Sequence, residues 1–393
     1  MINVLFVAHD SGLFGAQRTL LTFLERVDRQ RFHCRVVVPS CGGFTEALES
    51  LGIPFDQRHM VRWVPEAARL NSISRWRYLQ QLAHGLKGRA WAIAHLIQRH
   101  QIDLVYSNTV VCVEGAIAAR MSSVPHLWHI HEPISENPEL GAVLPAALYR
   151  LAVRHLSDRV VFCSRSVASD YPRLLAKATV VFNGISVPAT VDRSEARRAL
   201  GQKLNLKDST RLVSIVGAIQ PRKDHATFFA AAAKVAAMNN DVAFVVVGSG
   251  PKGLTTVLNE DVARRGLAGI THVLGWWPGH IRDIMAATDV LVVSSIQESF
   301  GLAAMEALSV ATPVVSTRCG GPQEILRDGV DGMLVSVGAA QQLADAINEF
   351  LDDPAKARAF GQSGRESVLA RYSVERYVEG LVQVIERTVA SSR

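Results

Sequence analysis

Two glutamates in the second half of the sequence have the types and spacing that chemistry needs. Glu298 directly precedes Ser299-Phe300-Gly301-Leu302, and Glu306 follows in a run of good helix formers. The apolar run Val290–Ser294 comes just before, so a helix is expected to begin near Gly301, at the end of a strand. Backbone N–H groups at such a helix start can hold a phosphate. A plain helix acid is the alternative for Glu298, whereas an unpaired Glu306 in so apolar a helix would be costly.

A glycine and two cations form the second signal. Gly217 ends the apolar run Arg211–Val216, and its missing side chain lets a ligand approach the backbone. Arg222 and Lys223 follow in the same turn, and Lys223 is suited to neutralise a diphosphate. An ordinary surface turn is the alternative interpretation of this segment.

The first half of the sequence contains two further candidate motifs. Gly12 and Gly15 lie between an apolar run and a helical pattern, where the backbone is open to an acceptor or a phosphate. His131 lies beside Glu132 at the end of the apolar run His126–Ile130, which predicts an oriented hydrogen-bonding or acid–base histidine. A tight turn and a packed histidine are the respective alternatives. No metal site is expected, because no further ligand repeats the spacing of these histidines.

A third glycine-rich segment has the glycine spacing of a dinucleotide-binding motif. Gly248-Ser249-Gly250-Pro251-Lys252-Gly253 follows an apolar run and formally matches G-x-G-x-x-G. That fingerprint also needs an acidic residue about 20 residues further on. None occurs between Asp261 and Asp283, so the segment is interpreted as a glycine-rich ligand loop starting at Gly248 rather than an NAD site.

Short continuous apolar runs alternating with helical patterns position these motifs. Such alternation is typical of parallel sheets covered on both faces. The pattern restarts after a polar segment near residues 188–205, which predicts an α/β chain with two doubly wound, Rossmann-like lobes. The predicted domains are residues 1–188, residues 189–372, and a C-terminal helix over 373–393 that returns to the first lobe. Ligands are expected at the carboxyl ends of the strands.

Composition excludes several protein classes. The chain has 393 residues, of which 48% are hydrophobic and 20% charged, so global disorder is excluded. Its five cysteines are scattered and form no C-x-x-C pair, which favours a reducing compartment. The sequence lacks a signal-peptide pattern and an uncharged apolar run long enough to span a bilayer. We therefore expect a cytoplasmic protein, with a peripheral position at the inner face of a membrane left open.

Positive charge gathers in residues 57–100. This segment contains eight Lys and Arg residues against the single acid Glu66, with three tryptophans between them. Either the segment is a solvated helix face, or it is attracted to anionic lipid headgroups or an acidic acceptor. Nucleic acid is not expected as a partner, because no recognition motif accompanies the charge.

Taken together, the motifs resemble those of the retaining glycosyltransferases of family 4, which have the GT-B fold. The resemblance extends over nearly the whole chain, and the Glu-x7-Glu spacing is its most specific part. The matching segments occur in this order: Gly12–Arg18, His131, Asn183-Gly184-Ile185, Gly248–Pro251, Glu298–Glu306, Gly320–Ile325 and Asp331-Gly332.

The resemblance implies a role for each candidate residue in transferring a hexose from a nucleotide-diphosphate sugar, with uridine the expected base and guanosine open. In the second lobe, Glu306 would hold the ribose and Glu298 the donor sugar. Backbone amides around Phe300, Gly301 and Leu302 would meet the diphosphate, with Lys223 stabilising it as it leaves. The implied donor-binding set is Gly217, Arg222, Lys223, Gly248, Phe300, Gly301, Leu302 and Glu306.

On the other lobe, His131 and the loop with Gly12 and Gly15 would face the acceptor. The acceptor is expected to be a glycan or a lipid-linked molecule, in glycan, polysaccharide or glycolipid biosynthesis. No cofactor or metal is expected. The family often has arginine where this chain has Ala218, so one phosphate-binding cation is missing. Three alternatives remain at this stage: a transferase for a soluble small-molecule or protein acceptor, a nucleotide-sugar epimerase, and a non-catalytic protein of the same fold.

Overall fold

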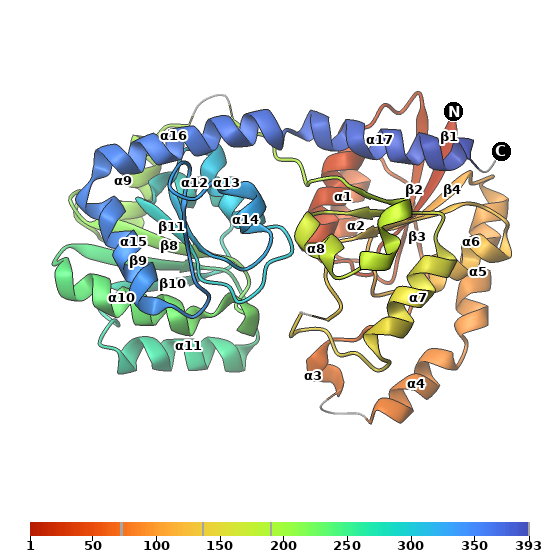
Figure 1. The fold of residues 1–393 in the computed structure, drawn as a ribbon, viewed down its shortest axis with the longest axis horizontal. Helices are drawn as coiled ribbons and strands as arrows, with labels where there is room; N and C mark the ends of the chain where they lie inside the picture. Colours follow the sequence, from red (N-terminus) through yellow and green to blue (C-terminus); the bar gives the residue numbers. More distant parts are fainter. Residues whose placement is uncertain (71–73, 136, 189–190, 392–393) are drawn as a thin grey trace. The chain divides into compact units, whose positions relative to one another are not determined.

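A computed structural model describes residues 1–70, 74–135, 137–188 and 191–391, which form two compact units (Figure 1). Unit 1 contains Met1–Gly184 and Val374–Arg393, and unit 2 contains Ile185–Ser373. The sequence analysis placed the boundary at residue 188, close to Ile185, where unit 2 begins.

Unit 1 is built on a seven-stranded parallel sheet in the order β3-β2-β1-β4-β5-β6-β7. Its strands are β1 (Ile2–Val7), β2 (Phe32–Val38), β3 (Phe55–Gln57), β4 (Leu104–Ser107), β5 (His126–Ile130), β6 (Arg159–Phe162) and β7 (Ala178–Val180). Its helices are α1 (Gly15–Arg26), α2 (Gly43–Ser50), α3 (Ala67–Leu70), α4 (Arg75–Ala83), α5 (Leu86–Arg99), α6 (Glu114–Met121), α7 (Ala146–Leu156), α8 (Arg165–Ser169), the 3-10 helix η1 (Pro172–Lys177) and α17 (Val374–Ala390).

Unit 2 is built on a six-stranded parallel sheet in the order β10-β9-β8-β11-β12-β13. Its strands are β8 (Arg211–Val216), β9 (Val242–Val247), β10 (Thr271–Gly275), β11 (Val290–Val293), β12 (Val314–Thr317) and β13 (Met333–Val335). Its helices are α9 (Arg193–Leu204), the 3-10 helix η2 (Pro221–Lys223), α10 (His225–Met238), α11 (Lys252–Arg264), α12 (Ile281–Ala287), α13 (Leu302–Ser309), α14 (Pro322–Ile325), α15 (Ala340–Asp352) and α16 (Pro354–Arg371).

The continuous apolar runs are explained by burial on both faces of each sheet. In β8 and β9, Val213, Ile215 and Phe244 belong to one apolar cluster, whereas Leu212 and Val245 belong to another. Successive side chains of a strand point to opposite faces of the sheet. Because an apolar cluster covers each face, these strands need apolar residues on both of their faces. This doubly wound arrangement is the one that the sequence predicted for each lobe.

Strand order reverses once in each unit. In unit 1, β1 lies between β2 and β4, and in unit 2, β8 lies between β9 and β11. In such sheets the loops after the two central strands diverge and leave a crevice at their carboxyl ends. The loops after β1 and β4, and those after β8 and β11, are therefore the places to look for a site.

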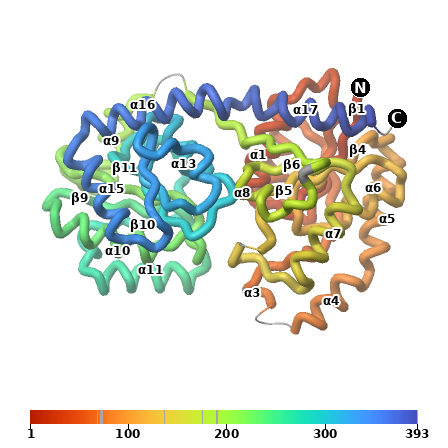
Figure 2. The backbone as a smooth tube through the Cα atoms, viewed as in Figure 1, coloured from red at the N-terminus to blue at the C-terminus, as the bar shows by residue number. Residues whose placement is uncertain are grey.

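The last helix, α17, packs on unit 1 although it follows unit 2 in the chain (Figures 1 and 2). Tyr377, Leu381 and Ile385 lie in one apolar cluster with Leu20 and Phe23 of α1. The Tyr377 hydroxyl donates to the Thr19 carbonyl at 3.2 Å. Apolar residues at helical spacing thus form the face that α17 buries.

Candidate functional site

In unit 2, the two cations predicted after β8 meet the glutamate predicted after β11. Lys223 Nζ lies 2.5 Å from Glu298 Oε1, and Arg222 Nη1 lies 3.1 Å from Glu298 Oε2. The Ser295 hydroxyl donates to Glu298 Oε1 at 2.8 Å. These residues meet because β8 and β11 are neighbours at the strand-order reversal.

Hydrogen bonds to backbone carbonyls fix the loops that carry these side chains. The Ser294 hydroxyl donates to the Lys223 carbonyl at 2.8 Å, and the Ile296 N–H donates to the Arg222 carbonyl at 2.8 Å. On its other side, Glu298 pairs with the loop after β12, donating its N–H to the Cys319 carbonyl at 2.7 Å. The charged cluster is thus held in place by polar contacts with the ends of three strands.

Two glycines follow β8 and β9, and the first of them gives the Lys223 side chain its space. Gly217 has a φ of +151°, and a Cβ there would lie 3.1 Å from Lys223 Cε. Gly248, at the end of β9, has a φ of +144°, and a Cβ there would lie 1.8 Å from the Gly217 carbonyl oxygen. A side chain would be strained at both positions, and at Gly248 its absence also lets the ends of β8 and β9 meet closely.

The two cations keep Glu298 ionised. Burial on its own would raise the pKa of the Glu298 carboxyl. Lys223 and Arg222, with hydrogen bonds from Lys223 and Ser295, outweigh burial and lower that pKa to about 2. Two cations and one carboxylate leave this cluster with a net charge of +1, which suits it to an anionic ligand.

The helix predicted after Glu298 begins one residue beyond Gly301. Gly301 is the N-cap of α13 with a φ of +101°, and a Cβ there would lie 2.9 Å from Pro322 Cγ. The first N–H groups of α13, from Leu302 onward, have no acceptor within the helix. Phe300 is buried, with its ring 5.8 Å from that of Tyr372. Glu306 lies on the same helix and is buried.

In unit 1, His131 is oriented by an asparagine that sequence reasoning missed. His131 Nε2 lies 3.1 Å from Asn108 Oδ1, and Asn108 Nδ2 donates to the Ala16 carbonyl at 2.9 Å. The donation to Ala16 orients the amide so that its oxygen faces the imidazole, which places the proton of His131 on Nε2. Burial and His9 lower the pKa of His131 to about 3, so this imidazole is neutral at physiological pH.

Glu132 does not orient His131, although it follows it in sequence. Its carboxylate accepts hydrogen bonds from the Thr109 hydroxyl and from the Val110 N–H, and so braces the loop after β4. Burial raises the pKa of Glu132 despite these two bonds. The useful sequence signal was a polar residue within two positions of the end of a buried strand, which Asn108 after β4 and Ser295 after β11 provide.

Gly12 and Gly15 belong to the loop and helix start after β1. The Gly12 N–H donates to Asp10 Oδ1 at 2.8 Å, and Arg62 Nη2 lies 2.7 Å from Asp10 Oδ2. Gly15 is the first residue of α1, after the exposed side chains of Leu13 and Phe14. Because Ala16 accepts from Asn108, this loop and His131 belong to one hydrogen-bonded arrangement.

Two kinds of feature are absent from the part of the chain that the structure describes. Its His, Cys, Asp and Glu side chains form no group of three suited to a metal ion. Over the same residues, none of the helices combines the length and apolar character that crossing a bilayer requires.

Two family models match the chain. The model described as Glycosyltransferase Family 4 matches residues 15–187, and the model described as Glycosyl transferases group 1 matches residues 196–367. The alpha-maltose-1-phosphate synthase of Mycolicibacterium smegmatis is 31% identical over 320 residues, which cover 73% of this chain and 79% of that protein. The 2-deoxystreptamine glucosyltransferase of Streptomyces kanamyceticus is 27% identical over 318 residues, covering 78% and 80%.

Solved structures with the same fold cover the whole chain or nearly so. Anabaena HepE in complex with UDP-glucose aligns with a TM-score of 0.83 and 22% identity, over 98% of this chain and 100% of that one. Sucrose-phosphate synthase from Thermosynechococcus elongatus aligns with a TM-score of 0.79 and 20% identity, over 100% of both chains.

Proposed function

Because the chain belongs to the group 1 glycosyltransferases of family 4 and has their GT-B fold, we propose that it moves a hexose from a nucleotide-diphosphate sugar to an acceptor hydroxyl with retention of configuration. The observation that carries this proposal is the cluster of Lys223, Arg222 and Glu298 beside the start of α13. HepE is similar in fold and is described in complex with UDP-glucose, which supports a uridine nucleotide as donor.

Lys223 and Arg222 would stabilise the diphosphate as it leaves. Charge develops on the leaving phosphate in the transition state, and cations already held in position need little reorganisation to meet it. Glu298 holds the two cations in position, because it forms an ion pair with each of them. Arg222 thereby supplies the positive charge that an arginine at the position of Ala218 would give. We propose that no metal is needed.

The remaining donor contacts would come from α13 and the strand ends. Backbone amides at Phe300, Gly301 and Leu302 would hold the diphosphate, with Glu306 at the ribose hydroxyls. Gly217 and Gly248 would let the donor come close to the backbone. Glu298 would contact the donor sugar through the carboxylate lone pairs that its ion pairs with Lys223 and Arg222 do not use.

His131 and the loop with Gly12 and Gly15 would face the acceptor. A neutral imidazole with its proton on Nε2 can accept a hydrogen bond at Nδ1. Retention would follow from a front-face displacement, in which the donor phosphate helps to deprotonate the acceptor hydroxyl.

The acceptor would be a glycan or a lipid-linked molecule at a membrane surface. Trp76 and Trp91 are 69% and 61% exposed in α4 and α5, next to basic residues. Exposed tryptophan with Lys and Arg suits the interface of an anionic bilayer. Residues 71–73 of the basic segment lie outside the described residues. Binding to phosphatidylglycerol vesicles that weakens with salt would support this part, and salt-independent or absent binding would contradict it.

A thermal-shift screen of nucleotide sugars, with and without EDTA, tests the donor site. A donor at about 100 times its Kd should stabilise the protein by about 2.7 kcal/mol. We expect one UDP- or GDP-sugar to do so, unaffected by EDTA, and Glu306→Ala to abolish the shift. Glu260→Ala is the matched control, because it removes an exposed carboxylate from a helix of the same unit.

The absence of a shift with every nucleotide sugar would contradict the proposed donor. A shift that disappears with EDTA would contradict the metal-free site. Conversion of the donor without any acceptor would instead indicate an epimerase.

A further inference from the structure

Unit 1 contains an open groove of about 1020 Å³ whose lining includes four arginines and no acid. His9, at the end of β1, lines one part of it, and residues of α4 line another. His9 precedes the loop with Gly12 and is close enough to His131 to lower the pKa of that imidazole. The groove therefore runs from the candidate acceptor side of unit 1 to α4, which α5 follows in Figure 1.

One face of α4 supplies donors to this groove. Arg77, Gln80, Gln81 and His84 line it, and their spacing along the helix puts them on one side. The other side of α4 is apolar and packs inward through Tyr78 and Leu82, which are buried. The orientation of α4 is thus fixed by its own pattern, and its polar face is presented to the groove.

Three of these arginines, Arg62, Arg77 and Arg89, differ in how far carboxylates already neutralise their charge. Arg62 forms ion pairs with Asp10 at 2.7 Å and Glu66 at 2.5 Å, and Arg89 pairs with Glu114 at 2.9 Å. Among the residues that the structure describes, no carboxylate comes within ion-pair distance of Arg77. The carboxylates paired with Arg62 and Arg89 compensate the charges of these partly buried arginines. The charge of Arg77 is not compensated in this way and is available to a ligand.

We propose that this groove binds a phosphate group of the acceptor, with Arg77 as the cation that holds it. The donors on its lining are the Arg77 guanidinium and the amides of Gln80 and Gln81 on α4, with the ring of His59 from the segment after β3. A phosphate has enough oxygens to accept from them together, and guanidinium binds it through parallel hydrogen bonds. This inference rests on the proposed glycosyl transfer, because it assigns a chemical class to the acceptor of that reaction.

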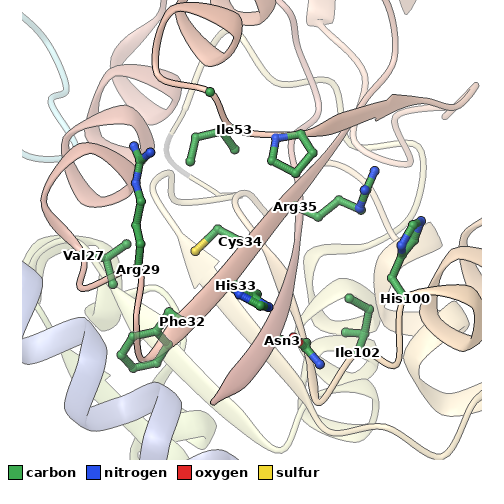
Figure 3. A pocket seen from close by; sticks show the side chains of 12 residues that line it. Asn3, Val27, Arg29, Phe32, His33, Cys34, Arg35, Ile53, His100 and Ile102 are labelled. Atoms are coloured by element: carbon green, nitrogen blue, oxygen red, sulfur yellow. The ribbon is translucent and has the colours of Figure 1, made fainter.

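A second hollow in unit 1 provides a control. It measures about 300 Å³ and lies at the opposite, amino-terminal end of the strands, where Arg29, Arg35 and His100 line it (Figure 3). In Figure 3 strand β2 passes between Arg29 and Arg35, so their side chains do not converge on one ligand. Arg29 is exposed and is therefore a matched arginine outside the proposed site.

Arginine footprinting tests the groove without relying on transferase activity. The native protein is treated with phenylglyoxal in inorganic phosphate or in sodium chloride of equal ionic strength, and modification is read at each arginine by mass spectrometry. We expect phosphate to slow modification of Arg77 severalfold and to leave Arg75 and Arg29 unchanged. Arg75 is on the same helix but does not line the groove. Equal protection of Arg75 and Arg77, or none at Arg77, would overturn the proposal.

Two phosphate sources are compared in the same assay. Glucose 1-phosphate represents a sugar phosphate, and phosphatidylglycerol in phosphatidylcholine vesicles represents a lipid phosphate. Selective protection of Arg77 by either one supports the proposal and identifies the source. Vesicles that protect Arg75 as strongly as Arg77 would match the bilayer contact proposed for α4 and α5 and would exclude lipid phosphate as the source, whereas equal protection of both arginines by glucose 1-phosphate would overturn the proposal.

Steady-state kinetics then connects the groove to the acceptor. Arg77→Gln should raise the KM for a phosphorylated acceptor about tenfold or more, as loss of a charge-assisted hydrogen bond predicts. The KM for its dephosphorylated form should stay unchanged, Arg77→Lys should restore part of the difference, and Arg29→Gln should have no effect. A uniform change for both acceptors would overturn the proposal. If the native protein transfers no sugar to any acceptor, the proposed function fails while the footprint still tests the groove.

Discussion

At the scale of single residues, Glu298 has a structural consequence as well as a proposed catalytic one. Its carboxylate is the shared partner of Lys223 and Arg222 in a largely buried position. Removing one member of a buried ion pair leaves the other charge without compensation, which costs more than the pair itself contributes. The donor site and the stability of unit 2 therefore depend on the same carboxylate.

We expect Glu298→Ala to destabilise unit 2 by about 3 kcal/mol, at the low end of the range for breaking a buried pair. The low end applies because the Lys223 and Arg222 side chains keep 14% and 21% of their exposure. Ser295→Ala removes one hydrogen bond from the same carboxylate and should cost about 1 kcal/mol. Urea unfolding followed by tryptophan fluorescence measures both. A Glu298→Ala protein as stable as the native one would show that the two cations are adequately solvated without their partner.

The types and places of these residues could be predicted from the sequence, but their pairing could not. Lys223 and Glu298 are 75 residues apart, and each was expected at the end of an apolar run. That they touch depends on β8 and β11 being neighbours, which local patterns do not encode. The contact between Asn108 and His131 was missed for the same reason, since β4 and β5 bring the loop with the candidate His131 beside a loop with Asn108 that looked ordinary.

At the scale of elements, long apolar runs were predicted well and short edge strands were not. The runs that became β5, β8 and β11 were expected at or nearly at their observed bounds. The edge strands β3, β7 and β13 have three residues each and are only partly buried, so they show no clear period. Their positions depend on pairing with a neighbouring strand rather than on their own composition.

Helix α17 can be tested at this scale. It packs into the core of unit 1, although all of unit 2 lies between it and the rest of unit 1 in the sequence. Leu381→Ala and Ile385→Ala should each destabilise unit 1 by about 2–5 kcal/mol, as expected for emptied core positions. Leu369→Ala is the control, since Leu369 is 44% exposed on α16, and it should change stability by no more than about 0.5 kcal/mol.

Tryptophan placement allows unit 1 to be followed separately. Trp276 and Trp277 belong to unit 2, whereas the other tryptophans belong to unit 1. In a Trp276→Phe, Trp277→Phe background, fluorescence therefore reports on unit 1. Lower stability in unit 2 alone after Leu381→Ala would contradict the assignment of α17 to the core of unit 1.

At the scale of the whole molecule, the two units should lose different amounts of stability as the pH falls from 6.5 to 5. In unit 1, burial lowers the pKa of His126 to about 4 and that of His131 to about 3, and holds the pKa of His129 well below its ordinary value of 6.5. The unfolded chain takes up these protons as the pH falls through 6.5, whereas in the folded unit His126 does so only near pH 4 and His131 near pH 3. Unfolding thus takes up protons in this range, and unit 1 loses stability as the pH falls.

Unit 2 has fewer such groups. Burial lowers the pKa of His225 to about 4, and the lowered pKa of Glu298 acts in a separate range. Because the pKa of Glu298 is lowered from 4.5 to about 2, its stabilisation is complete above about pH 4.5 and is lost only between there and pH 2. Between pH 6.5 and 5, His225 is the main source of acid sensitivity in unit 2 among these groups.

Urea unfolding at pH 8 and pH 5 in the Trp276→Phe, Trp277→Phe background should therefore show a large loss of stability in unit 1. His126 and His131 each contribute about 2 kcal/mol at pH 5 and the lowered pKa of His129 adds to this, which predicts a loss of several kcal/mol in unit 1 against about 2 kcal/mol from His225 in unit 2. His126→Asn should reduce by one the number of protons that unit 1 takes up on unfolding, and so reduce the change in its unfolding free energy between pH 8 and pH 5. His95→Asn, at an exposed position of α5, should leave it unchanged. An equal loss in both units would mean that the buried histidines of unit 1 take up protons without unfolding, and that burial does not hold them neutral.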